Sequence, residues 1–315
     1  MSPADVDRAL WFRRFGPPLD ALTLESAPAR PRPPGQARVR MVAAAINPSD
    51  LIPITGAYRH RVSPPRVAGY EGLGVVAEAD DPNLVGRRVL PLRGDGTWRT
   101  TVDADPELLI LVPDDIPVDI AARAYINPLA AMLMLEAHPV AGRRVLLTAA
   151  GSACARMLAA WALADGAREV VAVHRSPIHR ATLAAIGTTP VGQDDPTLIS
   201  RAARCDLAFD AVGGPLADAI LAALPRPADL VSYGLLSGSP FRPVAGGPTL
   251  RRFHLRDRLE GVANDEWRGW FDRLWPRLRR ADFLPDVRPF PLDDWREALA
   301  AFDEPGRTFK PMLAF

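Results

Sequence analysis

Short apolar runs separated by turn residues make up the first part of the chain. The runs at 39–46, 72–78 and 86–91 are rich in residues that favour strands. Clusters of proline and glycine, such as the one at 33–35, stand between such runs and mark turns. This pattern predicts a small, irregular, mostly β domain over residues 1–120.

A regular alternation of elements begins after residue 120. Residues 120–137 are apolar and alanine-rich, which favours a helix, and a helix can begin at Asn127-Pro128 with proline in its first turn. The pattern then becomes strand, glycine or serine turn, helix, strand, which is typical of a parallel, doubly wound α/β sheet over 121–261. The strands are expected at 145–148, 170–173, 207–210 and 230–233, and a helix at 156–164.

The remaining sequence, 262–315, is charged and amphipathic. Its large apolar residues recur at helical spacing, which is more typical of a helix packed on a core or on another domain than of a ligand site. These residues are Trp267, Trp270, Phe271, Leu274 and Leu278.

Length and charge narrow the class of protein. A chain of 315 residues is too long for one ordinary core and fits two domains. With 48% hydrophobic and 24% charged residues, the composition is that of a soluble globular protein. The net charge of +1 gives no electrostatic reason to expect a nucleic acid or an anionic membrane as partner. Arginine supplies nearly all the basic charge, and Lys310 is the only lysine.

Cysteine use and the N-terminal sequence favour a reduced, cytoplasmic protein. The two cysteines, Cys154 and Cys205, are too few for a disulfide framework or a four-cysteine zinc site. Within residues 1–14 the longest apolar run is 9–12, which is too short for a secretory signal. No apolar run in the sequence reaches the roughly 20 residues needed to span a bilayer.

The segment 148–156 has the small residues that a dinucleotide-binding turn needs. It reads Thr-Ala-Ala-Gly-Ser-Ala-Cys-Ala-Arg between an expected strand and helix, where backbone N–H groups can approach a pyrophosphate. From this segment alone, a tight turn that binds no ligand is the alternative. Cys154 is expected to be a small packing residue of this turn and not a nucleophile. The candidate cofactor-binding residues are Gly151, Ser152, Ala153 and Cys154.

The end of the next strand favours NADPH over NADH. NAD-binding folds place a carboxylate there to accept from the ribose hydroxyls, but this chain has His174 and Arg175. Arginine suits a 2′-phosphate because its planar fork can donate two hydrogen bonds. A solvated loop arginine is the alternative in so arginine-rich a chain.

Several short motifs together resemble one family. The chain reads Asn-Pro-Ser-Asp at 47–50, Gly-Ala-Tyr at 56–58, Gly-Tyr-Glu-Gly at 69–72, Gly-Thr-Trp-Arg at 96–99 and Ile-Asn-Pro-Leu at 126–129. With the turn described above, which is similar to an Ala-Ala-Asn-Ser-Gly-Val-Gly loop, they resemble the 2-enoyl thioester reductases and related quinone oxidoreductases. These enzymes belong to the zinc-independent medium-chain dehydrogenase/reductases, and the likeness covers nearly the whole chain.

The resemblance implies a GroES-like catalytic domain, 1–120 completed by 262–315, and a Rossmann cofactor domain, 121–261. Zinc-dependent members of the superfamily have Cys and His where this chain has Asn47 and Tyr70. Neither Asn nor Tyr is a normal zinc ligand, so no metal is expected. The resemblance also implies a homodimer formed by edge strands of the cofactor domain, which would cover an exposed edge.

The implied reaction is NADPH-dependent reduction of an activated double bond in a small-molecule substrate, a 2-enoyl thioester on coenzyme A or a carrier protein. Tyr58 is expected to stabilise or protonate the enolate, with loop packing as its alternative role. Asn47 is expected to orient Tyr58 or the nicotinamide, or else to stabilise a turn. Trp98 is expected to wall the acyl pocket or to pack the domain, and Asp50 to tie down its own loop.

Further cofactor-binding residues follow from the resemblance. They are Asn127, Tyr233, Gly234 and Lys310. A quinone or enone oxidoreductase without a dedicated acyl channel is the alternative enzyme. The alternative outside the enzymes is a catalytically silent protein that binds NADPH and acts as a structural or regulatory sensor.

Overall fold

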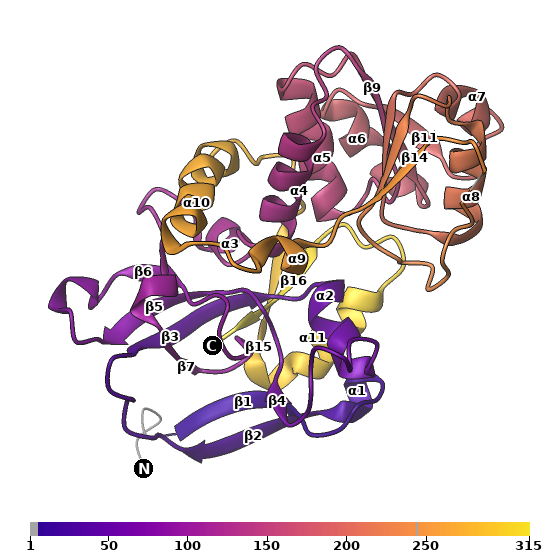
Figure 1. The fold of residues 1–315 in the computed structure, drawn as a ribbon. Coiled ribbons are helices and arrows are strands. Elements are labelled where there is room, and N and C mark those ends of the chain that lie inside the picture. The colour runs from indigo at the N-terminus through magenta and orange to yellow at the C-terminus, as the bar shows by residue number, and fades with distance from the viewer. Residues whose placement is uncertain (1–5, 244) are drawn as a thin grey trace. The chain divides into compact units, whose positions relative to one another are not determined.

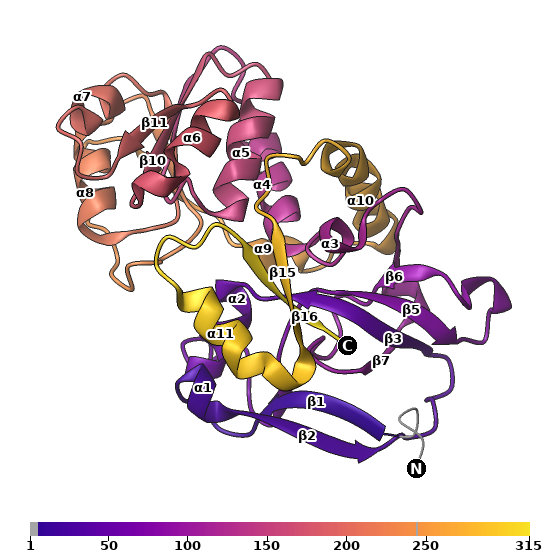
Figure 2. The same ribbon diagram turned by 180° about the vertical axis from the view of Figure 1, so that it is seen from behind.

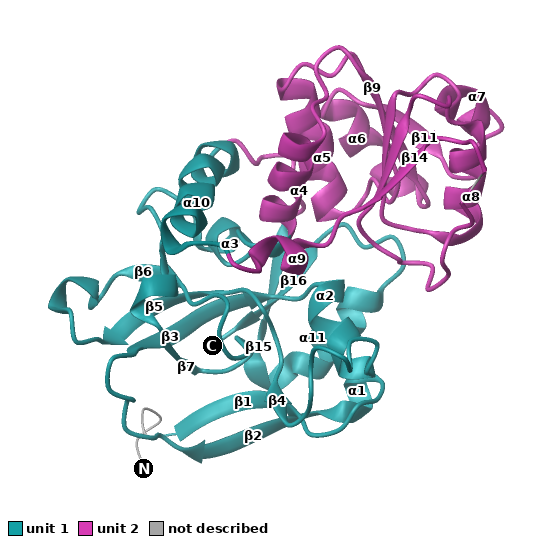
Figure 3. Cartoon of the chain, viewed as in Figure 1, with its two compact units in different colours: residues 1–126, 262–279, 286–315 teal, residues 127–261, 280–285 magenta. Residues whose placement is uncertain are grey.

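The chain forms two compact units, drawn in different colours in Figure 3. The computed structural model describes residues 6–243 and 245–315, so the first residues of the N-terminal segment considered above lie outside the described residues. No helix in the described ranges combines the length and the apolar character needed to cross a membrane. The first unit contains residues 1–126, 262–279 and 286–315, and the second contains 127–261 and 280–285.

The first unit is rich in strands. Within its described residues, a three-stranded sheet has the order β2-β1-β4 and a seven-stranded sheet the order β15-β16-β3-β5-β6-β8, with β7 also paired to β3. The apolar runs predicted at 39–46, 72–78 and 86–91 form β3, β5 and β6. The strands are β1 Val6–Phe12, β2 Leu22–Pro28, β3 Ala37–Ala45, β4 Arg66–Val67, β5 Leu73–Glu78, β6 Arg88–Leu90, β7 Thr101–Ala104, β8 Ile110–Leu111, β15 Val287–Pro291 and β16 Lys310–Ala314.

Helix α10 (Asn264–Leu278) carries the apolar stripe of the last segment, and all five stripe residues are buried. The ring of Trp267 lies edge-on to that of Tyr125, 5.7 Å between centroids, and its Nε1 donates to the carbonyl of Leu108 at 3.1 Å. The stripe is therefore packing surface, as its spacing predicts. The other helices of this unit are α1 Pro18–Ala21, α2 Pro48–Leu51, α3 Val118–Ala121 and α11 Trp295–Asp303.

The second unit is a doubly wound α/β domain. Its described residues form a six-stranded sheet of order β11-β10-β9-β12-β13-β14, and every neighbouring pair is parallel. Numbered within the unit, this order is 3-2-1-4-5-6, that of the Rossmann fold. Helices α5 and α6 lie on one face of the sheet, and α7 and α8 on the other (Figure 1 and Figure 2).

Strands β9, β10, β12 and β13 lie where the four strands were predicted, because each contains an apolar run that is largely buried. Strands β11 and β14 were not predicted, since β11 is only partly buried and β14 is charged and exposed. The strands are β9 Arg144–Leu147, β10 Glu169–His174, β11 Thr189–Gly192, β12 Leu207–Asp210, β13 Asp229–Ser232 and β14 Thr249–Arg252. The helices are α4 Ile126–Ala137, which begins in the first unit, α5 Ala153–Ala164, α6 Arg180–Ala185, α7 Leu198–Ala202, α8 Gly214–Ala223 and α9 Leu255–Leu259.

Strand β14 is one edge of this sheet, and it exposes charged residues. Arg251 and Arg252 are exposed, and Arg251 pairs with Asp229 at 3.1 Å. Charged side chains on an edge strand oppose pairing with another chain. The homodimer formed by edge strands stays a prediction.

Pairing of two β14 edges across a twofold axis would bring the arginines of two copies together, so added salt should strengthen association by screening them. We expect light scattering at micromolar concentration to give twice the chain mass of 34.2 kDa, with the dimer fraction rising as NaCl is added. A monomer at every salt concentration would contradict the dimer.

Candidate active site

Asn47 lies at the centre of a buried polar network in the first unit. It follows β3, begins the turn into α2, and has no exposed surface. Its amide oxygen accepts from the ammonium of Lys310 at 2.5 Å. Its amide nitrogen donates to the carboxylates of Glu71 at 2.6 Å and Asp50 at 3.1 Å. Both amide hydrogens of Asn47 are therefore engaged by its neighbours in this network.

The two carboxylates tie separate segments of the chain to this network. Asp50 accepts from the N–H of Asn47 at 2.8 Å, as predicted for a residue that ties down its own loop, and from the N–H of Tyr70 at 2.9 Å. Glu71 accepts from the N–H of Ile126 at 2.8 Å, at the start of α4. The sequence analysis gave Glu71 no role. Its position in the segment Gly-Tyr-Glu-Gly at 69–72, directly before a buried strand, could have indicated a buried carboxylate.

Burial shifts the ionisation of all three charged groups. It raises the pKa of Asp50 to about 7, with the nearby Glu71 carboxylate adding to the shift and the Lys310 ammonium opposing it. It also raises the pKa of Glu71 and lowers the pKa of Lys310 to about 8. One ammonium balances one carboxylate, so the second carboxyl group takes up a proton readily.

Tyr58 lies on the loop that follows this network. A 3-10 helix, Ile52–Thr55, ends at Gly56, whose φ of 86° suits glycine. The ring of Tyr58 is half-buried and packs against the core of the first unit. Its carbonyl accepts from the N–H of Val62 at 2.9 Å, which closes the next turn. The phenol is thus presented from an ordered loop at the margin of the core.

Trp98 is fully buried in the first unit, where it belongs to the same core cluster as Phe12 and Trp295. Its Nε1 donates to the carbonyl of Ala45 at 3.3 Å. A side chain without accessible surface contributes packing there, which favours the packing alternative. Its role as a wall of an acyl pocket stays a prediction.

The predicted phosphate-binding turn of the second unit is the start of α5. The helix begins at Ala153, inside the small-residue segment, and not at Arg156 as predicted. Ser152 is its N-cap, and the Ser152 hydroxyl accepts from the N–H of Ala155 at 3.3 Å. Capping chemistry, which apolar periodicity does not detect, sets this boundary. Gly151, Ser152 and Ala153 are only partly buried, so a ligand can approach them.

A second set of side chains supports this turn through hydrogen bonds that were not predicted from the sequence. The Thr148 hydroxyl donates to Asp210 at 2.7 Å and accepts from the N–H of Ala211 at 2.9 Å. The other oxygen of Asp210 accepts from the N–H of Gly213 at 2.9 Å. These bonds join the carboxyl ends of β9 and β12, where a Rossmann fold binds its ligand.

Two predicted cofactor residues carry buried polar atoms without a well-aligned protein partner. His174 is 6% exposed at the end of β10, and neither ring nitrogen makes a well-aligned hydrogen bond. Burial and the nearby Arg180 lower the pKa of His174, although a backbone contact with Ser176 favours its protonated form. The buried hydroxyl of Tyr233 makes no hydrogen bond either, and burial raises its pKa well above the usual value. Next to it, a Cβ at Gly234 would lie 2.8 Å from the carbonyl oxygen of Ala211, so that position requires glycine.

The other predicted cofactor residues differ in their surroundings. Arg175 is exposed after β10. Asn127 is half-buried on α4, and its carbonyl accepts from the Cys154 thiol at 3.8 Å. Burial raises the pKa of Cys154 to about 12, which suits a packing residue and not a nucleophile. Lys310 belongs to the network around Asn47 in the first unit.

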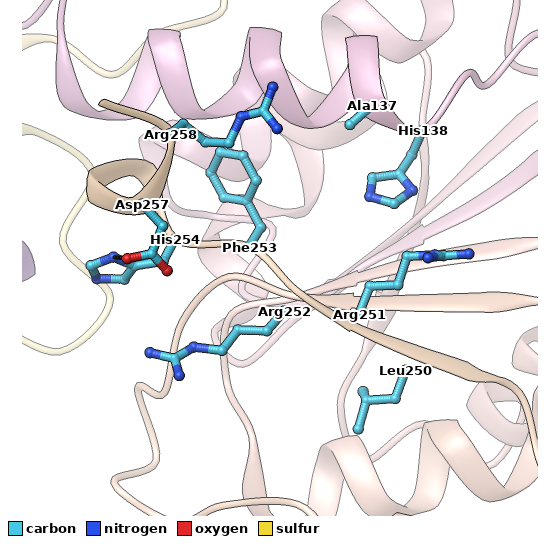
Figure 4. A pocket seen from close by; sticks show the side chains of 9 residues that line it. All are labelled: Ala137, His138, Leu250, Arg251, Arg252, Phe253, His254, Asp257 and Arg258. Carbon is cyan, nitrogen blue, oxygen red and sulfur yellow. Dashed lines mark ion pairs between the residues drawn. The ribbon is translucent and has the colours of Figure 1, made fainter. Parts of the chain in front are cut away.

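A basic pocket of about 530 Å³ opens beside β14 in the second unit (Figure 4). Its His254 and Asp257 pair at 3.6 Å. None of the predicted catalytic or cofactor-binding residues lines it. The lining residues are Ala137, His138, Leu250, Arg251, Arg252, Phe253, His254, Asp257 and Arg258.

The positions that carry zinc ligands in other members have different chemistry here. The amide of Asn47 is engaged by Lys310, Glu71 and Asp50, and Tyr70 contributes its N–H to Asp50. Within the described ranges, no three His, Cys, Asp or Glu side chains are grouped to hold a metal ion. Metal independence rests on this donor set and stays a prediction.

Comparisons with known proteins cover both units. Residues 33–114 match the family model of the alcohol dehydrogenase GroES-like domain. The chain is 30% identical over 339 residues to the mitochondrial enoyl-acyl-carrier-protein reductase of Homo sapiens, with 99% of this chain and 89% of the relative covered. It is 28% identical over 341 residues to the enzyme of that name from Arabidopsis thaliana, with 100% and 89% covered.

A solved structure gives the same picture. It is a candidate NADPH:quinone reductase from Bacillus thuringiensis, 29% identical, with 98% of this chain and 99% of that chain covered and a TM-score of 0.90. The likeness to these proteins therefore extends over both units of this chain. The chain belongs to the zinc-independent branch of the medium-chain dehydrogenase/reductase superfamily, and it is an oxidoreductase.

Proposed function

We propose that the chain is an NADPH-dependent reductase that transfers a hydride to the β-carbon of a 2-enoyl thioester. The observation that carries the proposal is Tyr58, a phenol on a loop that leads out of the buried network around Asn47. The names of the two curated relatives, both enoyl-acyl-carrier-protein reductases, support it. Both relatives are named mitochondrial, so their names do not support a cytoplasmic location for this chain. We propose that location separately, on its cysteine use.

The second unit offers residues that fit NADPH. Buried polar atoms without a well-aligned protein partner, as in His174 and Tyr233, are places where a ligand can supply the hydrogen bonds. Ser152 and Ala153 would meet the pyrophosphate at the N-terminus of α5, and Arg175 the 2′-phosphate. The similar Bacillus thuringiensis protein is named for NADPH. Bound NADPH would supply the hydride.

Tyr58 would act on the substrate carbonyl. Hydride addition at the β-carbon places negative charge on the conjugated carbonyl oxygen, and a phenol hydrogen bond stabilises that enolate. The same hydroxyl can pass a proton to the α-carbon. Asn47 would act indirectly, because its amide is bonded to Asp50, Glu71 and Lys310 and fixes the loop that leads to Tyr58. Lys310 would likewise position this loop.

Quinone reduction is the second candidate, and the likeness to the Bacillus thuringiensis protein favours it. NADPH oxidation should therefore be measured with crotonyl thioesters of coenzyme A and of acyl-carrier protein, beside small quinones. We expect the thioesters to be turned over faster than the quinones. The ratio of turnover rates on the coenzyme A and acyl-carrier-protein thioesters then indicates which carrier the enzyme prefers. Faster turnover of quinones would make the second candidate correct, and NADPH binding without oxidation would indicate a silent binding protein.

Tyr58→Phe should lower kcat on the best enoyl thioester by about 10²–10³, the loss measured for comparable oxyanion donors. The effect should fall on kcat, because the hydrogen bond strengthens as charge develops, and NADPH affinity should stay unchanged. Stopped-flow and steady-state assays with NADPH measure both. Tyr125→Phe is the matched control, since it also removes one phenol hydroxyl from the first unit. Wild-type kcat in Tyr58→Phe would reduce Tyr58 to a packing residue.

Arg175→Ala should weaken NADPH by about one to two orders of magnitude in Kd and NADH much less, because the lost charge-assisted bond is worth roughly 1.5–3 kcal/mol. Titration calorimetry with both cofactors measures the difference. Arg204→Ala, another exposed arginine of the second unit, is the control. Equal loss for both cofactors would mean that Arg175 does not contact the 2′-phosphate.

A further inference from the structure

Gly151 lies in the turn before α5, and a side chain at this position would collide with His179, a residue of another segment. The φ of Gly151 is not positive, so its backbone conformation does not demand glycine. A Cβ at this position would lie 2.4 Å from Cδ2, 2.7 Å from Nε2 and 2.8 Å from Cγ of His179. The imidazole of His179 therefore occupies the space that a side chain at residue 151 would need.

The tautomer of His179 follows from its neighbour. The Arg156 guanidinium, on the first turns of α5, approaches Nδ1 of His179 at 3.4 Å in a buried contact. A guanidinium can only donate, so Nδ1 must present its lone pair and the proton must reside on Nε2. Of the two ring nitrogens, Nε2 is the nearer to Gly151, next to Cδ2, the ring atom that lies closest. The contact with Arg156 thus leaves the N–H of His179 on the ring nitrogen nearer the predicted phosphate-binding turn.

The buried charge of Arg156 also favours an anionic ligand at the turn before α5. Arg156 is 4% exposed, and in the described part of the chain no carboxylate pairs with it. Its other hydrogen bond goes to the carbonyl of Phe283 at 3.4 Å, and its Nε has no partner. A buried cation without a counter-ion favours an anion nearby, as does the N-terminus of α5. The ring of His174, which makes no well-aligned hydrogen bond at the end of β10, independently indicates a ligand with polar groups in this unit.

We propose that His179 is a further cofactor-binding residue, whose Nε2–H donates to a pyrophosphate oxygen of the dinucleotide, with Arg156 as the residue that positions it. This inference rests on the proposed NADPH dependence. The enoyl thioester reductase loop that this chain resembles reads Ala-Ala-Asn-Ser-Gly-Val-Gly and has Asn where this chain has Gly151. His179 would place a donor in the space that a side chain at residue 151 would need.

Direct binding measurements test the donor. His179→Phe keeps an aromatic ring but removes the N–H, and it should raise the Kd of NADPH and of NADH alike by about ten-fold or more, because both contain the pyrophosphate. The Kd of 2′-AMP, which lacks the pyrophosphate, should not change. Titration calorimetry and quenching of tryptophan fluorescence give these constants without turnover. His138→Phe, a half-buried histidine of the same unit, is the matched control.

Variants at residues 151 and 179 test whether the imidazole of His179 occupies the space of a side chain at residue 151. His179→Ala should weaken NADPH like His179→Phe, and Gly151→Asn alone should lower the melting temperature, because its Cβ would overlap the imidazole. Gly151→Asn combined with His179→Ala should bind NADPH more tightly than His179→Ala alone. A double variant no better than His179→Ala would contradict the exchange.

Other results separate this inference from the proposed function. Wild-type Kd values for NADPH and NADH in a His179→Phe protein of unchanged melting temperature would overturn the role of His179 and leave the function standing. Equal weakening of 2′-AMP would also overturn it, because the contact would not be with the pyrophosphate. Absence of any dinucleotide binding by the wild-type chain would instead overturn the proposed function.

Discussion

One amide group joins opposite charges in the first unit. Asn47 presents its oxygen to the ammonium of Lys310 and its N–H groups to the carboxylates of Asp50 and Glu71. Only this orientation works, since the reverse would set the amide oxygen against the carboxylates and N–H groups against the ammonium. Removing one member would leave the others buried and unpaired, which destabilises more than loss of the contact itself.

The only lysine of the chain stands in this network, although arginine supplies every other strong base. A compact ammonium can donate to a single amide oxygen, whereas a planar guanidinium needs more room and more acceptors. The carboxylates in turn accept the N–H groups of Tyr70 and Ile126. The network therefore fixes the loop leading to Tyr58 and the entry to α4, at positions where zinc-dependent members of the superfamily carry metal ligands.

The sequence predicts the fold more fully than the site. Buried parallel strands appear as continuous apolar runs, so β12 (Leu207–Asp210) has the predicted bounds, and small residues reveal the turn before α5. Lys310, in contrast, contacts Asn47 across most of the chain, and no local pattern carries that pairing. The same holds for His179 and Arg156, whose contact depends on how η5 (Pro177–His179) packs on α5. Trp98 is a large aromatic residue, which could line a pocket or fill a core. The sequence does not distinguish these roles, and its burial in the structure favours packing.

If a hydrogen-bonded network has replaced the metal site, the enzyme must work without a metal. The most direct test is elemental analysis of the purified, active protein, with turnover of the best substrate measured before and after treatment with a strong chelator. The donor set of Asn47 and Tyr70 predicts far less than one zinc per chain and unchanged turnover after chelation. Near-stoichiometric zinc that is lost together with activity would contradict it.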